Sequence, residues 1–361
     1  MKGFAIYRLP HDQQCTLVRQ TSGEPMLLDR CALLHEVSGF VMAPFSVTPE
    51  CPLLLIRPDR VETYALDDGS LQEAISEFAT VKLGDCNQQS GGVLPSDARH
   101  SYADSFRRFH ERLVNDDFRK VVLSRCLTIP HAADVNPIEL YERACRRYPR
   151  LFVALAYTPQ SGMWLTATPE ILLEGIGDQW RTIALAGTMK LEGEELNGEG
   201  EQMRWSPKNI EEQRLVASYI YEQLKPYANN LREEGPRTVR AANLVHLRSD
   251  FSFTLLNNGI GELLDSLHPT PAVCGLPKSE TYRFILDQEP TPRRYYSGFM
   301  GPLNIRRETH LYVALRCMEM TREAYHLYAG GGLLKESVEE QEWQETEAKL
   351  ETMKEILVSP L

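Results

Sequence analysis

The sequence is organised around the stretch Tyr328-Ala-Gly-Gly-Gly-Leu-Leu-Lys-Glu-Ser337 and the acidic segment 339–349 that follows it. On a helix, Glu342, Glu345 and Lys349 would share one strip, because they are spaced three and four residues apart. The adjoining strip carries the apolar side chains Trp343, Leu350, Met353 and Leu357. This pattern predicts a helix that packs on the core with its carboxylates at the edge of the contact. Carboxylates beside the glycine backbone suit a hard cation such as Mg²⁺ and a nearby oxyanion. The alternative is that this segment is a solvated acidic helix on the surface.

The composition excludes some classes of partner. The 361 residues include 39 Lys and Arg against 50 Asp and Glu, which gives a formal charge of -11, and no polybasic patch stands out. We therefore expect no nucleic-acid partner. A small dianion could still bind through a few local Lys or Arg side chains, main-chain N–H groups or a metal.

The sequence also predicts a soluble, cytoplasmic protein. Residues 1–8 lack the apolar centre of a signal peptide, and no run of about 18 apolar residues is present, so we expect no membrane partner. The eight cysteines are scattered without CxxC or CxxH spacing, which favours reduced structural thiols over disulfides or zinc.

The pattern along the chain predicts groups of strands with hairpin-like links, separated by helices. No composition break marks a linker, so we expect one domain over residues 1–361, with strand and turn chemistry before residue 98. The fold class expected is α+β, with largely antiparallel sheets and helices outside. The strands are predicted at residues 4–9, 25–28, 39–44, 52–56, 120–129, 151–157, 163–167, 171–174, 180–186, 243–253, 295–301, 311–320 and 325–329. The helices are predicted from residue 101 and at residues 137–147, 208–224, 278–287 and 339–349.

Several connecting segments carry their own expectations. Residues 85–97 are predicted to form a surface loop, and the charged, glycine-spaced segment 190–200 is a plausible lid. Gly187-Thr188 is expected to be a small-residue turn that can approach a ligand. Residues 267–277 contain three prolines and are expected to form a rigid loop that walls a pocket.

Four residues outside the C-terminal segment are candidates for chemistry. A partly buried Lys120 could act as a general base, and its alternative is a solvated lysine at a strand edge. Glu170 stands between a proline and an apolar run, where desolvation would raise its pKa toward that of a general acid. Glu212 shares the apolar face of its predicted helix and needs a cationic partner or a metal. Arg316 interrupts an apolar strand and needs an anionic partner, either a carboxylate of the protein or one of a ligand. His246, by contrast, is interpreted as structural.

Eight motifs in order then carry a resemblance to the chorismate-utilising enzymes, a family that includes isochorismate, salicylate, anthranilate and aminodeoxychorismate synthases. The motifs are Lys120-Val-Val-Leu-Ser-Arg125, Ala167-Thr-Pro-Glu170, Leu185-Ala-Gly-Thr188, Glu211-Glu-Gln-Arg-Leu-Val216, Leu267-His-Pro-Thr-Pro-Ala272, Tyr296-Ser-Gly298, Val313-Ala-Leu-Arg-Cys317 and the stretch from Gly330 to Lys349. They make residues 99–357 the expected catalytic core, and residues 1–98 the less typical part. The resemblance implies two facing, largely antiparallel sheets flanked by helices, with chorismate as the substrate and Mg²⁺ as the cofactor.

The resemblance also implies a role for each site residue. Glu212 and Glu345 resemble the Mg²⁺ ligands, assisted by Glu342, with the first two carboxylates expected within ~4–6 Å of each other. The substrate-binding groups implied are Thr188, Arg316, Gly331, Gly332 and Lys349. Lys120 resembles the base that activates water at C2, and Glu170 the acid that protonates the C4 hydroxyl.

Lys120 also bears on the choice within the family, because members that use ammonia usually carry Gln there. A lysine therefore implies an isomerase, isochorismate synthase, of the menaquinone or siderophore pathway, with a monomeric state as the expectation. A salicylate synthase, an aminating synthase and a chorismate-binding subunit without activity are the alternatives. Asn209 departs from the family pattern, which often has a carboxylate at that position, and Gly331 stands where many relatives have Ala.

Overall fold

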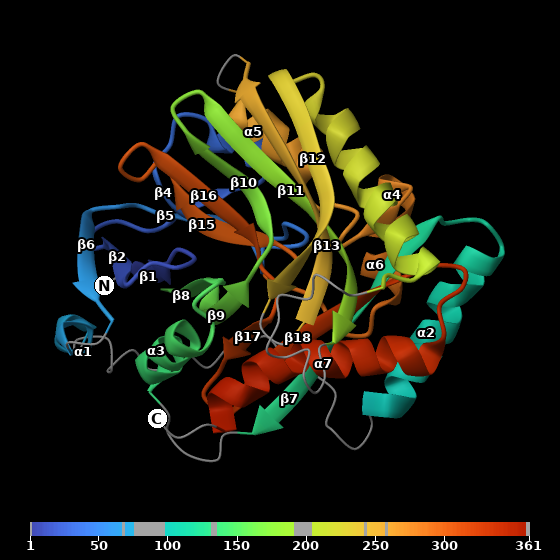
Figure 1. The fold of residues 1–361 in the computed structure, drawn as a ribbon. Coiled ribbons are helices and arrows are strands. Elements are labelled where there is room, and N and C mark those ends of the chain that lie inside the picture. Colours follow the sequence, from blue (N-terminus) through green and yellow to red (C-terminus); the bar gives the residue numbers. More distant parts are fainter. Residues whose placement is uncertain are drawn as a thin grey trace.

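Two large antiparallel sheets form the centre of the molecule. The computed structural model describes residues 2–66, 69–75, 98–130, 136–190, 204–241, 244–256 and 259–358. Within these residues each sheet has nine strands, and every pairing of neighbouring strands is antiparallel. Figure 1 shows the two sheets with helices along their outer sides. The predicted α+β architecture is confirmed.

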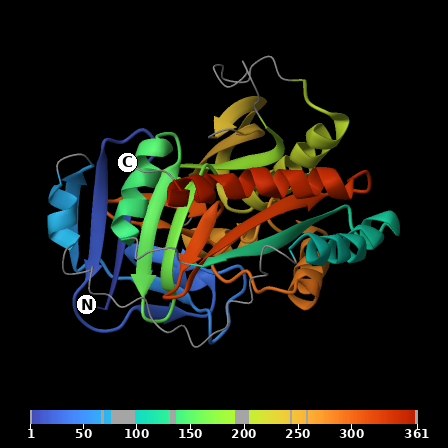
Figure 2. The same ribbon diagram turned by 90° about the horizontal axis from the view of Figure 1, so that it is seen from below.

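The strands of the two sheets come from all along the chain. The first sheet runs β14 (Gly275–Leu276), β7 (Lys120–Pro130), β18 (Ala324–Leu333), β17 (Cys317–Met320), β9 (Gly162–Thr168), β8 (Phe152–Thr158), β1 (Gly3–Arg8), β2 (Gln14–Gln20) and β6 (Arg60–Ala65). The second runs β12 (Ala228–Ala241), β13 (Leu244–Leu255), β11 (Gln179–Lys190), β10 (Ile171–Ile176), β16 (Glu308–Val313), β15 (Phe299–Leu303), β4 (Gly39–Ala43), β5 (Leu53–Ile56) and β3 (Met26–Leu28). Strands before residue 66 thus complete the far end of both sheets, and in Figure 2 the N-terminal strands lie beside β8 and β9.

A buried core lies between the sheets because their strands turn apolar side chains toward each other. Phe152 of β8 and Tyr312 of β16 stack across the interface with ring centroids 4.3 Å apart and an interplanar angle of 4°. Phe40, Trp164 and Ile183 belong to the same cluster and are at most 2% exposed. Burial of such aromatic and branched side chains is the main stabilising contribution to a fold of this kind.

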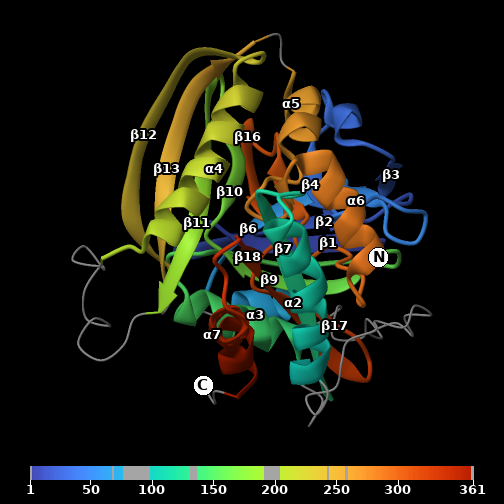
Figure 3. The same ribbon diagram turned by 90° about the vertical axis from the view of Figure 1, so that its right-hand side faces the viewer.

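The helices cover the outer faces of the sheets. They are α1 (Ser70–Ile75), α2 (Ala98–Val114), α3 (Pro137–Arg147), α4 (Pro207–Leu224), α5 (Ile260–Leu267), α6 (Lys278–Gln288), α7 (Glu339–Val358) and the 3-10 helix η1 (Cys31–Leu34). Apolar side chains of α3 and α7 pack on the first sheet, and those of α4 and α5 pack on the second. Figure 3 shows α2, α4, α5 and α6 together on one side of the molecule. No helix within the described residues is long and apolar enough to span a membrane.

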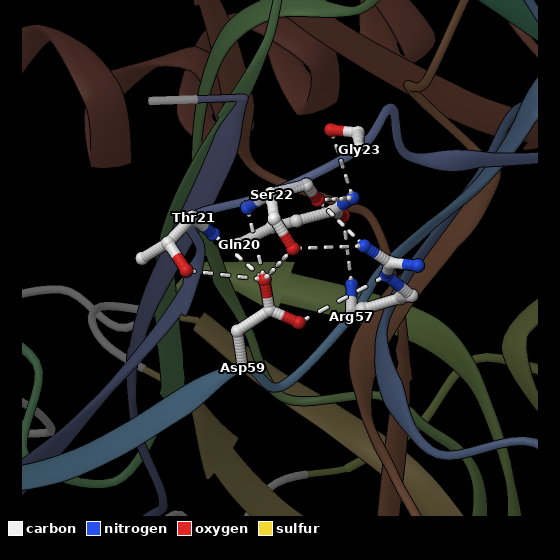
Figure 4. A network of polar contacts seen from close by, with 6 residues as sticks. All are labelled: Gln20, Thr21, Ser22, Gly23, Arg57 and Asp59. Carbon is white, nitrogen blue, oxygen red and sulfur yellow. Dashed lines mark hydrogen bonds and ion pairs between the residues drawn. The ribbon is translucent and has the colours of Figure 1, made fainter.

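A polar clamp joins two turns of the N-terminal strands (Figure 4). The Asp59 carboxylate accepts hydrogen bonds from the backbone N–H groups of Thr21 (2.9 Å) and Ser22 (3.0 Å) and from both hydroxyls. These backbone donors hold the pKa of Asp59 below its usual range. The Gln20 side chain meanwhile accepts from the backbone N–H of Arg57 at 3.0 Å. The clamp fixes the end of β2 against the link between β5 and β6.

Three local predictions are wrong in an informative way. Residues 311–320 do not form one strand: β16 ends at Val313 and β17 begins at Cys317 in the other sheet. Gly187-Thr188 is not a turn but a bulge inside β11, where the register shifts between Ala186 and Thr188 and Gly187 has φ +70°. The last strand does not stop before the glycines, because β18 runs through them to Leu333.

Other expectations meet the structure in part. Residues 295–298 precede β15 rather than belonging to it. The predicted loop at 85–97 lies outside the described residues, and so does the predicted lid at 190–200 apart from Lys190, which ends β11. The seven described cysteines are free and buried, as predicted for structural thiols, and Cys86 lies outside the described residues.

Candidate active site

The glycine stretch of β18 forms the floor of the candidate site. Gly330, Gly331 and Gly332 pair with Ser124, Leu123 and Val122 of β7, so their backbone is held within the sheet. A Cβ on Gly332 would overlap the Glu212 carboxylate and lie 2.8 Å from Lys120 Cε. A Cβ on Gly331 would lie 3.4 Å from Glu342 Oε2 and 3.7 Å from Glu345 Oε1. The glycines therefore let carboxylates from two helices approach the strand backbone.

Helix α7 carries two of these carboxylates and is fixed by its own tryptophan. The guanidinium groups of Arg99 and Arg125 lie 5.1 Å and 3.9 Å from the centre of the Trp343 ring. Arg125 also donates to Thr346 Oγ1 at 2.8 Å and pairs with Glu347. These contacts set the rotation of α7, so that Glu342 and Glu345 face the glycine stretch.

Helix α4 supplies the third carboxylate. Ser206 caps the helix by accepting from the Asn209 N–H at 3.2 Å, and Pro207 fits the first turn, where its missing N–H is not needed. Glu212 lies one turn further along and is 9% exposed, as its place on the apolar face predicts. Burial alone would raise the pKa of Glu212, but the charges of Lys120, Lys208 and Lys349 hold it below its usual range.

Lys120 is fully buried at the start of β7. Its Nζ donates to the Pro271 carbonyl at 2.9 Å and lies 3.1 Å from Glu212 Oε1. From the segment 267–277, which is predicted to wall a pocket, Ala272 and Val273 line the cavity described below. The alternative of a solvated lysine at a strand edge is wrong.

Glu170 is buried, with an exposure of 3%. It follows Pro169 and directly precedes β10, as the sequence suggests. Burial raises the pKa of Glu170 to about 8, although the charges of Lys120, Lys349 and Arg316 act in the opposite direction. The carboxyl group is therefore protonated at neutral pH, which is the form that a general acid needs.

Arg316 lies where the chain passes from one sheet to the other, and its φ is +45°. Its guanidinium is buried, and Nη1 donates to the Ala241 carbonyl at 3.1 Å while Nη2 donates to His246 Nε2 at 2.7 Å. Among the described residues no carboxylate forms an ion pair with it, and burial lowers its pKa to about 10. A buried cation held by neutral groups alone favours binding of an anion.

His246 is the residue that sequence reasoning missed. It lines the same cavity, and its Nδ1 lies 3.3 Å from Thr188 Oγ1. Burial, followed by the charges of Arg316 and Lys349, lowers the pKa of His246 well below its usual range, so the ring is neutral. A neutral imidazole can accept from Arg316 at one nitrogen and contact Thr188 through the other. A histidine in a strand gives no sequence signal that separates this position from a packed core position.

These side chains line two neighbouring cavities, which we call the inner and the outer cavity. The polar residues lining the inner cavity are Glu170, Thr188, Glu212, His246, Arg316 and Lys349, together with backbone at Gly330 and Gly332. The outer cavity is lined by Thr188, Lys208, Asn209, Glu342, Glu345 and further residues of α7. Thr188 thus belongs to both cavities. Lys120 lies just behind Gly332, and Gly331 lies beside the α7 carboxylates.

The carboxylates fit a divalent cation by chemistry, although they are paired with lysines. Glu342 is 1% exposed, and its Oε2 accepts no hydrogen bond from the described residues. Burial and the neighbouring Glu345, opposed by Lys208, raise the pKa of Glu342 to about 7. Three carboxylate groups beside bare backbone form an oxygen donor set of the kind that Mg²⁺ prefers. As the side chains stand, no three acidic, His or Cys side chains of the described residues form a group that could hold a metal ion.

The fold and the site together are those of an enzyme, with acidic and basic side chains around a cavity that Lys349 and the buried Arg316 line. The sequence of residues 70–358 matches the model of a family described as chorismate binding enzyme. The chain therefore belongs to the chorismate-binding enzyme family.

Two relatives of known name are isochorismate synthases. The chain is 28% identical over 280 residues to the isochorismate synthase DhbC of Bacillus subtilis, a match that covers 74% of this chain and 70% of DhbC. It is 30% identical over 239 residues to the isochorismate synthase EntC of Escherichia coli, covering 65% of this chain and 61% of EntC.

Solved structures share the fold. A DhbC protein of Bacillus anthracis superposes with a TM-score of 0.79 at 22% identity, over 99% of this chain and 96% of that chain. The menaquinone-specific isochorismate synthase MenF of Escherichia coli gives a TM-score of 0.75 at 22% identity, over 98% and 88% of the two chains. Anthranilate synthase component I of Streptococcus pneumoniae gives 0.69 at 17% identity, with 98% and 92% covered. At such identities the likeness shows the shared fold.

Proposed function

We propose that the protein is an isochorismate synthase, which converts chorismate to isochorismate with Mg²⁺ as cofactor. The observation that carries the proposal is Glu170, a carboxyl with a pKa of about 8 in a cavity that also contains the buried Arg316. Loss of the C4 hydroxyl of chorismate requires a proton, and a neutral Glu170 can donate it. The substrate has two carboxylates, and Arg316 and Lys349 are the cations that line the inner cavity.

The reaction divides into steps that these residues can perform. Water adds at C2 and gives up a proton, the two ring double bonds each shift by one position, and the C4–oxygen bond breaks. The departing hydroxyl takes a proton from Glu170 and leaves as water, so the product is an isomer of the substrate. Lys120, in its neutral amine form, is the proposed acceptor of the proton from the incoming water. Bound Mg²⁺, held by Glu212, Glu342 and Glu345, would neutralise a carboxylate of the substrate.

The choice of water as nucleophile rests on Lys120 and on the relatives. The lysine is buried and directed toward Glu212, in the place where ammonia-using members of the family usually carry Gln. Relatives whose names include menaquinone and vibriobactin both form isochorismate, so the proposal specifies this product and leaves the pathway open. Cytoplasmic location and a monomeric state stay predictions.

Product identification tests the proposal. The purified protein is incubated with chorismate and Mg²⁺, and the products are separated by chromatography with and without EDTA. We expect isochorismate without pyruvate, and no turnover after the metal is removed. Salicylate with stoichiometric pyruvate would instead identify a salicylate synthase, and anthranilate formed only with ammonium would identify an aminating enzyme. Chorismate that stays unchanged over hours would contradict an enzymatic function.

A further inference from the structure

Three lysines surround the glycine stretch, and each is paired with one of the three carboxylates. The pairs are Lys120 with Glu212 (3.1 Å), Lys349 with Glu345 (2.7 Å) and Lys208 with Glu342. In this arrangement the ammonium groups neutralise the carboxylates that a divalent cation would use. A cation can therefore bind only if at least one lysine leaves.

Lys208 is held less firmly than the other two lysines. Lys120 also donates to the Pro271 carbonyl at 2.9 Å, and Lys349 also donates to the Gly330 carbonyl at 2.8 Å. For Lys208 the structure gives one hydrogen-bond acceptor within the described residues, the Glu342 carboxylate. Its side chain is 22% exposed, and it lines the outer cavity. Lys208 can thus move into the outer cavity without losing a second hydrogen bond.

The Glu342 carboxylate that Lys208 would leave lies beside that of Glu345, near the backbone of Gly331. Glu342 Oε2 and Glu345 Oε1 lie 3.4 Å and 3.7 Å from the position that a Cβ of Gly331 would take. Glu342 Oε2 is buried and has no hydrogen-bond donor among the described residues. A buried carboxylate oxygen without a donor is costly, so a cation bound between the Glu342 and Glu345 carboxylates would stabilise it.

We infer that Lys208 is the internal counter-cation of the Glu342–Glu345 pair and is displaced into the outer cavity when a divalent cation binds. The inference rests on the proposed function, because it requires the cation of that proposal. Lys208 then competes with the cation for Glu342. It weakens cation binding, and it stabilises the carboxylate pair when no cation is present.

The test measures cation binding rather than activity. The full-length wild type and Lys208→Gln are titrated with Mg²⁺ in a calorimeter and with Mn²⁺ by electron paramagnetic resonance, without chorismate. Removal of a competing charge from a partly buried ion pair should tighten binding roughly three- to tenfold. Lys208→Arg, which keeps the charge, should bind like the wild type. Thermal unfolding without cation should show a lower Tm for Lys208→Gln, and added Mg²⁺ should narrow this difference.

Lys354→Gln is the matched control. Lys354 bridges Glu347 and Glu351 on the same helix, at 2.9 Å and 3.0 Å, but it lines neither cavity. Its replacement should leave the cation affinity unchanged. Equal or weaker binding by Lys208→Gln, in a protein that unfolds cooperatively, would overturn the inference while leaving the cation site intact. Absence of binding in both the wild type and Lys208→Gln would instead overturn the cation part of the proposed function, and the inference with it.

Discussion

Two buried arginines show how differently this fold treats the same side chain. Arg293 is 4% exposed and donates to both oxygens of Glu289, at 2.7 Å and 2.6 Å, and to the carbonyls of Val122 and Val273. Arg316 is 5% exposed and donates to a carbonyl and a neutral imidazole.

The pKa values of the two guanidinium groups shift in opposite directions. For Arg293, burial acts to lower the pKa, but Glu289 outweighs it and the pKa is raised. For Arg316, burial dominates and lowers the pKa to about 10. The first arginine is satisfied by the protein, and Glu289 also accepts from the Ser124 N–H of β7 at 2.9 Å. The second has no carboxylate partner among the described residues, which suits its proposed role in binding a substrate carboxylate. This difference distinguishes a structural ion pair, Arg293 with Glu289, from an arginine of the proposed substrate site.

The largest effect is expected for Glu170, which lies on the binding-site side of this comparison. Glu170→Gln keeps the shape of the side chain but cannot donate the proton, so turnover should fall ~10²–10⁴-fold. Chorismate consumption and isochorismate formation, followed by chromatography, measure this loss. Urea unfolding at neutral pH should give a stability no lower than that of the wild type, because Gln carries no charge to desolvate. Turnover at the wild-type rate would remove Glu170 from the acid role.

The two arginines themselves provide the second prediction. Arg293→Met leaves Glu289 buried without its partner and should destabilise the protein by ~3–5 kcal/mol. Arg316→Met leaves no buried carboxylate without its partner, so the free energy of unfolding should stay unchanged or rise. KM for chorismate should increase. Denaturant unfolding and steady-state kinetics measure the two quantities. Equal destabilisation by both variants would contradict the distinction between an arginine in an ion pair and one held by neutral groups.

The third prediction concerns pH. The pKa of Glu170 is raised from 4.5 to about 8 in the protein without substrate, so kcat/KM should fall as the pH rises above about 8 and the acid loses its proton. Between pH 4.5 and about pH 8 the folded protein keeps a proton on Glu170 that the unfolded chain releases. The contribution of Glu170 to the free energy of unfolding therefore decreases as the pH rises from 4.5 to about 8. A pH series of unfolding experiments on the wild type and Glu170→Gln should show a shallower decrease for the variant. A rate that stays constant up to pH 10 would contradict the assignment.

The smallest effect is expected at Gly331. A Cβ there would make ordinary contacts with Glu342 and Glu345, so Gly331→Ala should change stability by less than ~0.5 kcal/mol. Gly332→Ala is the informative counterpart, because its Cβ would overlap the Glu212 carboxylate and approach Lys120. Thermal unfolding and turnover of both variants test whether the floor of the site tolerates a methyl group at one position only. A similar loss in both would contradict this geometry.

The sequence predicts which residues are buried better than it predicts which distant segments of the chain come into contact. Helical periodicity places Glu212 on an inward face, and the apolar run after Lys120 predicts a strand, and both hold in the structure. The apolar run 311–320 reads as one strand because its composition does not change where the chain crosses between sheets. Only the backbone at Arg316, with a positive φ on a residue that is not glycine, marks the crossing. Long-range partners such as His246 for Arg316 depend on sheet register, which periodicity does not specify.

The packing of Trp343 against two guanidinium groups has an optical consequence. Trp343 is one of four tryptophans, and it adjoins Glu342 in the sequence. The emission of an indole ring responds to charges over its faces, and Arg99 and Arg125 lie over this ring. A small rotation of α7 would change both distances at once. The molecule therefore contains its own fluorescent reporter of events at the neighbouring carboxylates, without any added label.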